Sequence, residues 1–258
     1  MFINAVILAQ IGVAVLFIRY LLQQNRGAKE PPKIIGLAIV LGVIAIVASY
    51  YLETWFVDSK LLVLGPRQLS TAATLHQSLL VGLIEEGSKS LPLAFLIYSR
   101  RYFNKITDGV VYFGICGMIF GLIENIKYSL TLGEAAGIGK VITGPYIHAG
   151  FAVLIGWTLA RQKVLHRSWW FVVAGFVAAL GLHGLYDFGL IYGSGWTVLM
   201  SLFITLAINI NIFILLKNAQ REDGRLGLAA VGKNYFCRNC GTPNPDQFLY
   251  CLSCGQKT

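Results

Sequence analysis

Charged residues are scarce in this chain of 258 residues: Asp, Glu, Lys and Arg make up 13% of it, and hydrophobic residues make up 56%. The mean hydropathy is +0.65. Soluble globular proteins carry about 25% charged residues, so this composition excludes that class. Cysteine is nearly absent before the last forty residues, with Cys116 alone, and no internal repeat or long low-complexity run stands out. We therefore expect an all-α polytopic membrane protein.

Seven apolar stretches are long enough to cross a bilayer, which takes roughly 20 helical residues. They are residues 2–22, 33–52, 75–98, 106–127, 144–161, 169–191 and 196–217. The first has no basic residue before it and no small-residue cleavage site after it, so it is expected to remain as a span. We divide the chain into a membrane domain (1–217), a linker (218–235) and a small C-terminal appendage (236–258).

Acidic residues are also few, 12 against 21 basic ones, which gives a net charge of +9. Such an excess would suggest nucleic acid in a soluble protein, but in a membrane protein Lys and Arg mark the cytoplasmic loops. They cluster after the first, third and fifth spans and at the start of the tail. This predicts an N-terminus outside, a cytoplasmic tail, and no nucleic-acid partner.

Three charged residues interrupt the third apolar span: Glu85, Glu86 and Lys89. An ionised side chain in mid-membrane costs on the order of 3 kcal/mol, so these residues are expected to face the interior of the bundle. Glu85 and Lys89 are four residues apart and can pair on one helix face. Glu86 lies about 100° further around the helix.

The next three spans carry further polar residues: Glu124, Asn125, His148, His183 and Asp187. At a rise of 1.5 Å per residue, the carboxylates and imidazoles lie roughly 20 to 27 Å from the cytoplasmic ends of their helices. This depth is one layer in the outer half of a core roughly 30 Å thick. Close helix packing that brings these groups together is predicted by the small-residue strip Gly114, Gly117 and Gly121.

Three kinds of chemistry suit such a layer. A carboxylate can act as a base toward water. His183 and Asp187, four residues apart, can share a metal ion or a water molecule, and a metal held by His, Asp and Glu activates its bound water. The same groups also serve proton or ion relays in transporters. A lone intramembrane histidine is often only an interhelical hydrogen bond, but eight such residues in one layer favour a functional site.

The order of the motifs resembles the PrsW family of intramembrane proteases. The matching elements are E-E-x-x-K at 85–89, F-x-x-x-E-N at 120–125, His148, and H-x-x-x-D at 183–187. The CAAX prenyl endopeptidases and bacteriocin-processing membrane proteases are similar in layout but have a histidine where Glu124 stands. The resemblance covers roughly residues 75–192.

The resemblance implies hydrolysis of a peptide bond of a membrane-anchored protein, such as an anti-sigma factor, in a bacterial cell membrane. Family members are regarded as metalloproteases. On this hypothesis one of Glu85 and Glu86 polarises the attacking water, and Glu85 is favoured because Lys89 can orient it. Asn125 donates a hydrogen bond to the substrate carbonyl. The remaining groups bind a catalytic zinc ion or stabilise the oxyanion: His148 and His183, with Glu124 or Asp187.

Two other functions use the same residues. A transporter or channel would use the buried carboxylates as a relay, and it would need polar residues that continue to the cytoplasmic face. A non-catalytic membrane scaffold would keep the motifs and act through its tail. Retention of every expected ionisable residue argues against the scaffold.

The tail contains two C-x2-C pairs separated by ten residues, each followed by glycine: Cys237, Cys240, Cys251 and Cys254. This spacing predicts a zinc ribbon with a tetrahedral structural zinc site. A cytoplasmic location argues against disulfides. The ribbon serves either as a metal-stapled mini-domain or as a module for a cytoplasmic protein partner.

Overall fold

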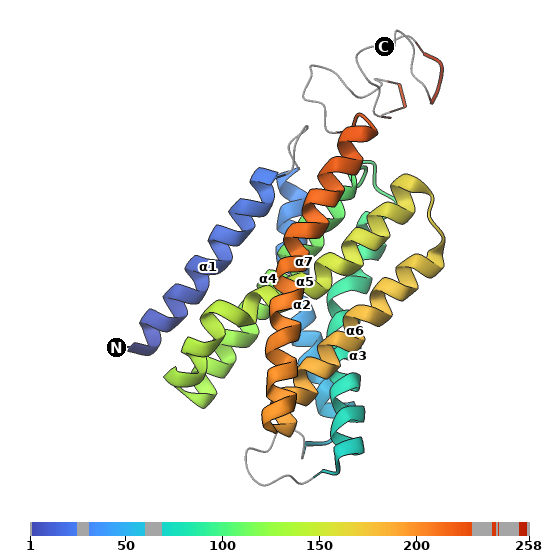
Figure 1. The fold of residues 1–258 in the computed structure, drawn as a ribbon. Coiled ribbons are helices and arrows are strands. Elements are labelled where there is room, and N and C mark those ends of the chain that lie inside the picture. Colours follow the sequence, from blue (N-terminus) through green and yellow to red (C-terminus); the bar gives the residue numbers. More distant parts are fainter. Residues whose placement is uncertain are drawn as a thin grey trace.

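The computed structural model describes residues 2–24, 31–59, 69–228, 239–240, 242 and 253–256. In these residues the chain forms helices and no strand, which confirms the all-α class. The helices are α1 (Phe2–Gln24), α2 (Pro32–Phe56), α3 (Thr71–Ile97), α4 (Ile106–Leu132), α5 (Glu134–Leu165), α6 (Trp169–Tyr192) and α7 (Gly195–Arg225). They pack side by side as an elongated bundle (Figure 1).

Several helices are longer than the apolar stretches predicted. The second helix continues to Phe56, the fifth begins at Glu134, and the seventh continues to Arg225. Residues 218–225, which the sequence pattern assigned to a linker, are therefore the last turns of α7. Pro92 lies inside α3, which continues beyond it to Ile97.

Five helices are long and apolar enough to cross a membrane: α1, α2, α4, α6 and α7. The other two have sufficient length, with 27 residues in α3 and 32 in α5. Helix α3 carries Glu85, Glu86 and Lys89 near its centre, and these lower its hydropathy. The chain is therefore an integral membrane protein, and the count of seven spans stays a prediction.

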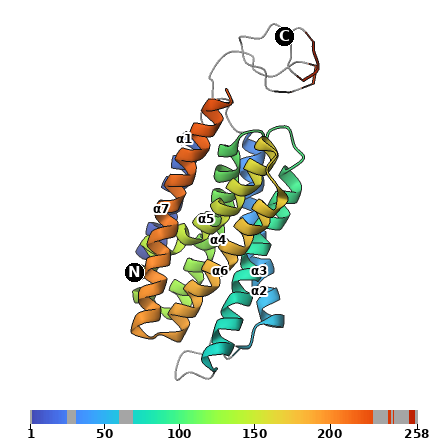
Figure 2. The same ribbon diagram turned by 45° about the vertical axis from the view of Figure 1, so that its right-hand side comes forward.

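Basic residues gather at one end of the bundle. There α3 and α5 end, α4 and α6 begin, and α7 reaches its last turn, at the upper end of the bundle in Figures 1 and 2. We call this the basic end and the opposite one the far end. Basic residues of the described chain at the basic end include Arg100, Arg101, Lys105, Arg161, Lys163, Arg167, Lys217, Arg221 and Arg225.

Exposed tryptophans lie near both ends of the bundle. Trp169 and Trp170, at the start of α6, are 54% and 78% exposed, and Trp55 and Trp196, toward the far end, are 77% and 84% exposed. Tryptophan is enriched at both interfaces of membrane proteins. The two pairs are therefore consistent with a bilayer that surrounds the middle of the bundle.

Helix α4 lies at the centre of the bundle and contacts α1, α2, α3, α5 and α7. It is buried almost continuously from Ile106 to Gly121. A Cβ atom on Gly117 would lie 2.5 Å from the carbonyl oxygen of His148 on α5. The close packing predicted for this glycine is therefore confirmed, and it brings His148 against α4.

Helices α3 and α6 also approach backbone to backbone. A Cβ on Gly82 would lie 2.7 Å from the Leu180 carbonyl oxygen, and a Cβ on Gly184 would lie 2.7 Å from Cα of Leu79. Because glycine has no side chain, it permits this approach. The contact brings the central turns of α3 beside His183.

The last turns of α7 are fastened to the basic end. Asp223 is buried, and its carboxylate accepts hydrogen bonds from the backbone N–H groups of Ile106 (2.8 Å) and Thr107 (3.0 Å) at the start of α4. Glu222 pairs with Arg161 of α5 at 2.9 Å. A carboxylate at a helix N-terminus satisfies free N–H groups and complements the helix dipole. Residues 218–225 are therefore packed as part of the bundle.

Of the four tail cysteines, Cys240 and Cys254 belong to the described residues, and Cys237 and Cys251 lie outside them. The amide nitrogen of Asn239 lies 3.8 Å from Sγ of Cys254. Gly255, which follows the second pair, has a φ of 70°, a conformation that favours glycine.

Candidate active site

The charged residues of α3 are buried in the centre of the bundle. Glu85 is 4% exposed, Glu86 is fully buried and Lys89 is 1% exposed. Lys89 Nζ lies 2.6 Å from Glu86 Oε1 and 3.6 Å from Glu85 Oε2. The predicted pairing of Lys89 with Glu85 is therefore present, but the shorter contact is to Glu86.

His183 of α6 lies between the two glutamates. Its Nδ1 is 2.8 Å from Glu86 Oε1, and its Nε2 is 3.5 Å from both Glu85 Oε2 and Asp187 Oδ2. The short contact holds a proton on Nδ1, which donates to the carboxylate. In the neutral ring, the lone pair of Nε2 then faces two carboxylates, an arrangement that a cation or a proton stabilises.

His148 of α5 is oriented in the same way by a different carboxylate. Its Nε2 lies 2.7 Å from Glu124 Oε2. Its Nδ1 lies 3.6 Å from Glu85 Oε2 and 3.4 Å from Lys89 Nζ. Donation from Nε2 to Glu124 leaves the Nδ1 lone pair directed toward Glu85. One nitrogen of each imidazole therefore faces Glu85 Oε2.

Aromatic rings fix the planes of the two imidazoles. The Phe151 ring stacks on His183, with centroids 4.9 Å apart and an angle of 18° between the planes. Phe120 lies 5.3 Å from His148 by ring centroids, and Lys89 Nζ lies 4.3 Å from the centre of the same phenyl ring. Both phenylalanines are fully buried. Rotation of either imidazole is thus restricted by packing as well as by hydrogen bonds.

The side chain of Asn125 lies against Gly144 of α5 rather than beside the other predicted site residues. It is fully buried, and a Cβ on Gly144 of α5 would collide with its amide group. Its Oδ1 and Nδ2 have no hydrogen-bond partner in the described part of the chain. No described contact joins it to Glu85, His148 or His183. The predicted bond from Asn125 to a substrate carbonyl stays a prediction.

Two residues that the sequence pattern did not single out border the site. Glu53, half-buried on α2, interacts electrostatically with Glu124, Asp187 and His183. Phe151, described above, covers one face of the His183 ring. Glu53 was missed because the second apolar stretch was ended at residue 52. Its signal is a carboxylate inside YYLETWF, a segment whose aromatic residues continue the helix to Phe56.

Glu85, His148 and His183 fit a metal ion. One ligand atom from each lies within 4.8 Å of the others, and all three residues are buried. Tetrahedral ligands at about 2.1 Å from zinc are roughly 3.4 Å apart, close to the 3.5 and 3.6 Å from Glu85 Oε2 to the two imidazole nitrogens. Glu85 Oε2 is buried without a hydrogen-bond partner. Two imidazoles and a carboxylate are a common zinc ligand set.

The surrounding charge also favours a cation. Four carboxylates, those of Glu85, Glu86, Glu124 and Asp187, converge on the two imidazoles, and Lys89 is the ammonium that pairs with them. The carboxylates outnumber the ammonium groups among these contacts, and a buried negative charge is costly unless it is paired. A divalent cation would offset this excess of carboxylates.

A family model described as "PrsW family intramembrane metalloprotease" matches residues 30–216, a region that contains every helix with a site residue. The chain belongs to the PrsW family. Protease PrsW of Geobacillus kaustophilus is 26% identical over 194 residues, which cover 75% of this chain and 82% of the relative. Protease PrsW of Bacillus subtilis is 25% identical over 199 residues, covering 76% and 87%.

A shorter match, to protease PrsW of Halalkalibacterium halodurans, is 32% identical over 111 residues and covers 42% of this chain and 51% of the relative. No solved structure matches the chain significantly. This PrsW-family member is thus an intramembrane protease and an integral protein of a bacterial membrane, as the sequence motifs predicted. The tail beyond residue 216 lies outside the family match.

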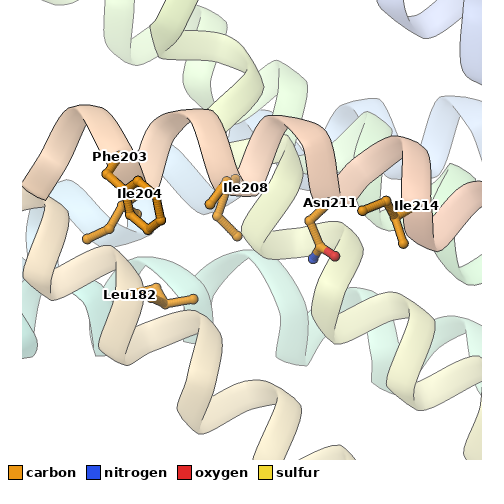
Figure 3. A pocket seen from close by; sticks show the side chains of 7 residues that line it. Leu182, Phe203, Ile204, Ile208, Asn211 and Ile214 are labelled. Carbon is orange, nitrogen blue, oxygen red and sulfur yellow. The ribbon is translucent and has the colours of Figure 1, made fainter.

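An apolar pocket between α6 and α7 lies apart from the site (Figure 3). Leu182, Phe203, Ile204, Ala207, Ile208, Asn211 and Ile214 line it. Phe203 is 70% exposed and Ile214 is 49% exposed, so the pocket opens toward the lipid side of the bundle. No site residue lines it, and we assign it no role in hydrolysis.

Proposed function

We propose that this protease cleaves a membrane-anchored regulatory protein, such as an anti-sigma factor, in the outer half of the bilayer. The basic end lies in the cytoplasm by the positive-inside rule, and seven helices cross the membrane. His183 is fourteen residues from Trp169, roughly 21 Å along α6, which supports a site nearer the far, outer face. Convergence of both imidazoles on Glu85 carries the proposal.

Glu85, His148 and His183 are the proposed zinc ligands. When bound, zinc lowers the pKa of its water and polarises a peptide carbonyl. Glu86 and Glu124 hold the two imidazoles in the tautomers that direct a lone pair toward Glu85. Lys89 compensates the charge of Glu86. In this assignment Glu85 is a ligand rather than the base.

Asp187 is the proposed proton carrier. Its carboxylate lies 3.5 Å from His183 Nε2, and its side chain is 20% exposed, so water and substrate can reach it. It accepts the proton of the attacking water, and it returns that proton to the amine when the C–N bond breaks. The attacking oxygen stays on the new carboxyl group, which balances the hydrolysis.

One contact favours a second mechanism for the same reaction. Lys89 Nζ lies 3.4 Å from His148 Nδ1, the nitrogen that would have to ligate zinc. If Lys89 donates a hydrogen bond there, Glu85 itself takes the proton of the attacking water, as the sequence hypothesis held. His183 then stabilises the oxyanion in its imidazolium form, which donates from Nε2 while Nδ1 keeps its bond to Glu86.

A transporter fits the structure poorly. One turn from the ionisable residues toward the basic end lie Leu93, Phe120, Phe151 and Ala179, all fully buried, which we call the apolar floor. A proton or ion relay needs polar groups that continue to the opposite face. Ser90 of α3 is a buried hydroxyl near this level, but the four residues of the apolar floor carry no ionisable group that would continue a relay.

We also propose that residues 236–258 fold as a cytoplasmic zinc ribbon, joined to the membrane domain by a linker and available to a cytoplasmic protein partner. Cys237, Cys240, Cys251 and Cys254 would hold the structural zinc. The proximity of Asn239 to Cys254 supports the approach of the two pairs, and the backbone of Gly255 suits a knuckle turn.

The test is a cleavage assay in proteoliposomes with a single-span model substrate. We expect Glu85→Gln and His183→Ala to abolish cleavage by folded protein under both mechanisms. Glu222→Gln, the same chemical change at the basic end, should retain it. A zinc content of Glu85→Gln that is one ion per chain below that of the wild type supports the ligand role, whereas an unchanged content assigns Glu85 as the base. Normal cleavage by either site variant would disprove the proposed site.

A further inference from the structure

Access to the site is one-sided. The apolar floor closes it toward the basic end. Side-chain exposure is 5% or less at Glu85 and His183, but it rises to 12% at Glu124 and 20% at Asp187. Substrate therefore enters from the far end, past Glu124 and Asp187, an opening we call the mouth.

Helix α2 forms one wall of the mouth. Glu53, in its last turn, interacts electrostatically with Glu124, Asp187 and Lys127. Lys127 lies one turn beyond Glu124 toward the far end, and its ammonium is 4.9 Å from the centre of the Tyr50 ring of α2. The side chain of Glu53 is only half-buried, so it is accessible to a substrate in the mouth.

The mouth is negatively charged. It holds three carboxylates, those of Glu53, Glu124 and Asp187, and the groups of opposite sign that interact with Glu53 are the ammonium of Lys127 and the imidazole of His183. At its base, Glu85 Oε2 is buried without a hydrogen-bond partner. In a low-dielectric surrounding, like charges of a substrate are repelled and opposite charges attracted more strongly than in water.

We propose that Glu53 is a specificity residue that selects substrates with a lysine or arginine on the far-end side of the scissile bond. This inference rests on the proposed cleavage at Glu85, His148 and His183. Glu53 is the residue to test because Glu124 and Asp187 contact the imidazoles directly, whereas the described interaction of Glu53 with His183 is electrostatic and without a hydrogen bond. A basic side chain in the mouth would pair with Glu53 while the peptide bond lies over Glu85.

The experiment uses full-length protein in liposomes and a pooled library of single-span peptides. The four residues that follow the span on the outer side vary between Lys, Gln and Glu, and cleavage products are read by mass spectrometry. For the wild type we expect roughly tenfold more cleavage of Lys peptides than of Glu peptides. Glu53→Gln should bring this ratio close to one, and Glu53→Lys should invert it.

Asp58→Asn is the matched control, because it removes a carboxylate just beyond α2 at the same end of the bundle. It should keep the wild-type ratio. A wild type that cleaves without charge preference, or Glu53→Lys that keeps the preference for Lys, overturns this inference alone. A wild type that cleaves no peptide overturns the proposed cleavage, and the inference falls with it.

Discussion

Each imidazole of the site makes one short contact with a carboxylate and directs its other nitrogen toward Glu85. The contacts are 2.8 Å for His183 with Glu86 and 2.7 Å for His148 with Glu124. Such outer carboxylates fix the tautomer and raise the basicity of a ligand histidine. In the proposed site Glu86 and Glu124 are therefore positioning residues, although the sequence motif places Glu86 directly beside Glu85.

Glu124→Gln tests this positioning role at the residue scale. The amide keeps the shape of the carboxylate but lacks its charge, so His148 is held less firmly in the required tautomer. Loss of such a partner typically costs 10- to 100-fold in activity or metal affinity. We expect kcat/KM to fall by about this factor while the melting temperature changes little. Full activity would show that His148 needs no charged partner.

Phe151→Leu tests the stacking on His183. Leucine fills most of the volume but offers no flat face, so the imidazole gains rotational freedom. We expect kcat to fall about tenfold with KM nearly unchanged, at a stability cost of about 1 kcal/mol. Phe113→Leu is the control, because Phe113 is a buried core residue of α4 with no described contact to the site. A similar loss of kcat in both variants would show that Phe151 contributes packing alone and that its stacking on His183 does not matter for kcat.

The close approach of helices α3 and α6 sets the relative positions of the site residues that they carry. The backbones meet at Gly82 and Gly184, and the nearest atoms are backbone atoms that cannot rotate away. Glu86 of α3 and His183 of α6 lie just beside this contact. The separation of the two helices therefore sets the 2.8 Å bond between their side chains.

Gly184→Ala should push these helices apart. Its Cβ would lie 2.7 Å from Cα of Leu79, so we expect a lower melting temperature and more than tenfold loss of activity, about 1 to 3 kcal/mol of overpacking. Gly181→Ala, three residues earlier on the same helix, has nothing within 4 Å and should be neutral. Both quantities are measured on purified protein by thermal unfolding and peptide cleavage. Equal behaviour of the two variants would contradict the role of the contact.

The helices were predictable from the long apolar stretches. The site layer was predictable because an ionisable residue inside such a stretch is expected to face the interior of the bundle. The closest partner of Lys89 was not predictable, because the spacing alone allows Lys89 to reach Glu85 or Glu86. Packing of α6 places His183 beside Glu86, and Lys89 lies closest to the same carboxylate. The direction of Asn125 was also open, because residues 124 and 125 lie about 100° apart on a helix. Only the neighbouring helix determines which of them faces the site.

Helix α7 continues past residue 217, where the seventh predicted span ends, for a related reason. Residues 218–225 are polar and read as a linker, but Asp223 caps α4 and Glu222 pairs with Arg161, so tertiary contacts extend the helix. These contacts lie between the membrane domain and the tail. A truncation at residue 217 would remove them, so experiments that separate the two proposed zinc sites should keep the full chain.

Zinc content of the full-length protein tests both sites together. We expect two zinc ions per chain, one in the membrane site and one in the tail, measured by elemental analysis of protein purified without chelators. The double variant Cys240→Ser, Cys254→Ser should keep one, because it removes half of the tail ligands and leaves α7 intact. Addition of His183→Ala should remove the other.

The double variant decides the mechanism. Retention of one zinc that is lost with His183→Ala assigns the membrane site as the metal site, since His183 is one of the three proposed ligands. If the double variant holds no zinc but still cleaves peptide, the membrane site works without metal. Lys89 would then serve His148 as a hydrogen-bond donor, and Glu85 would be the base that activates water.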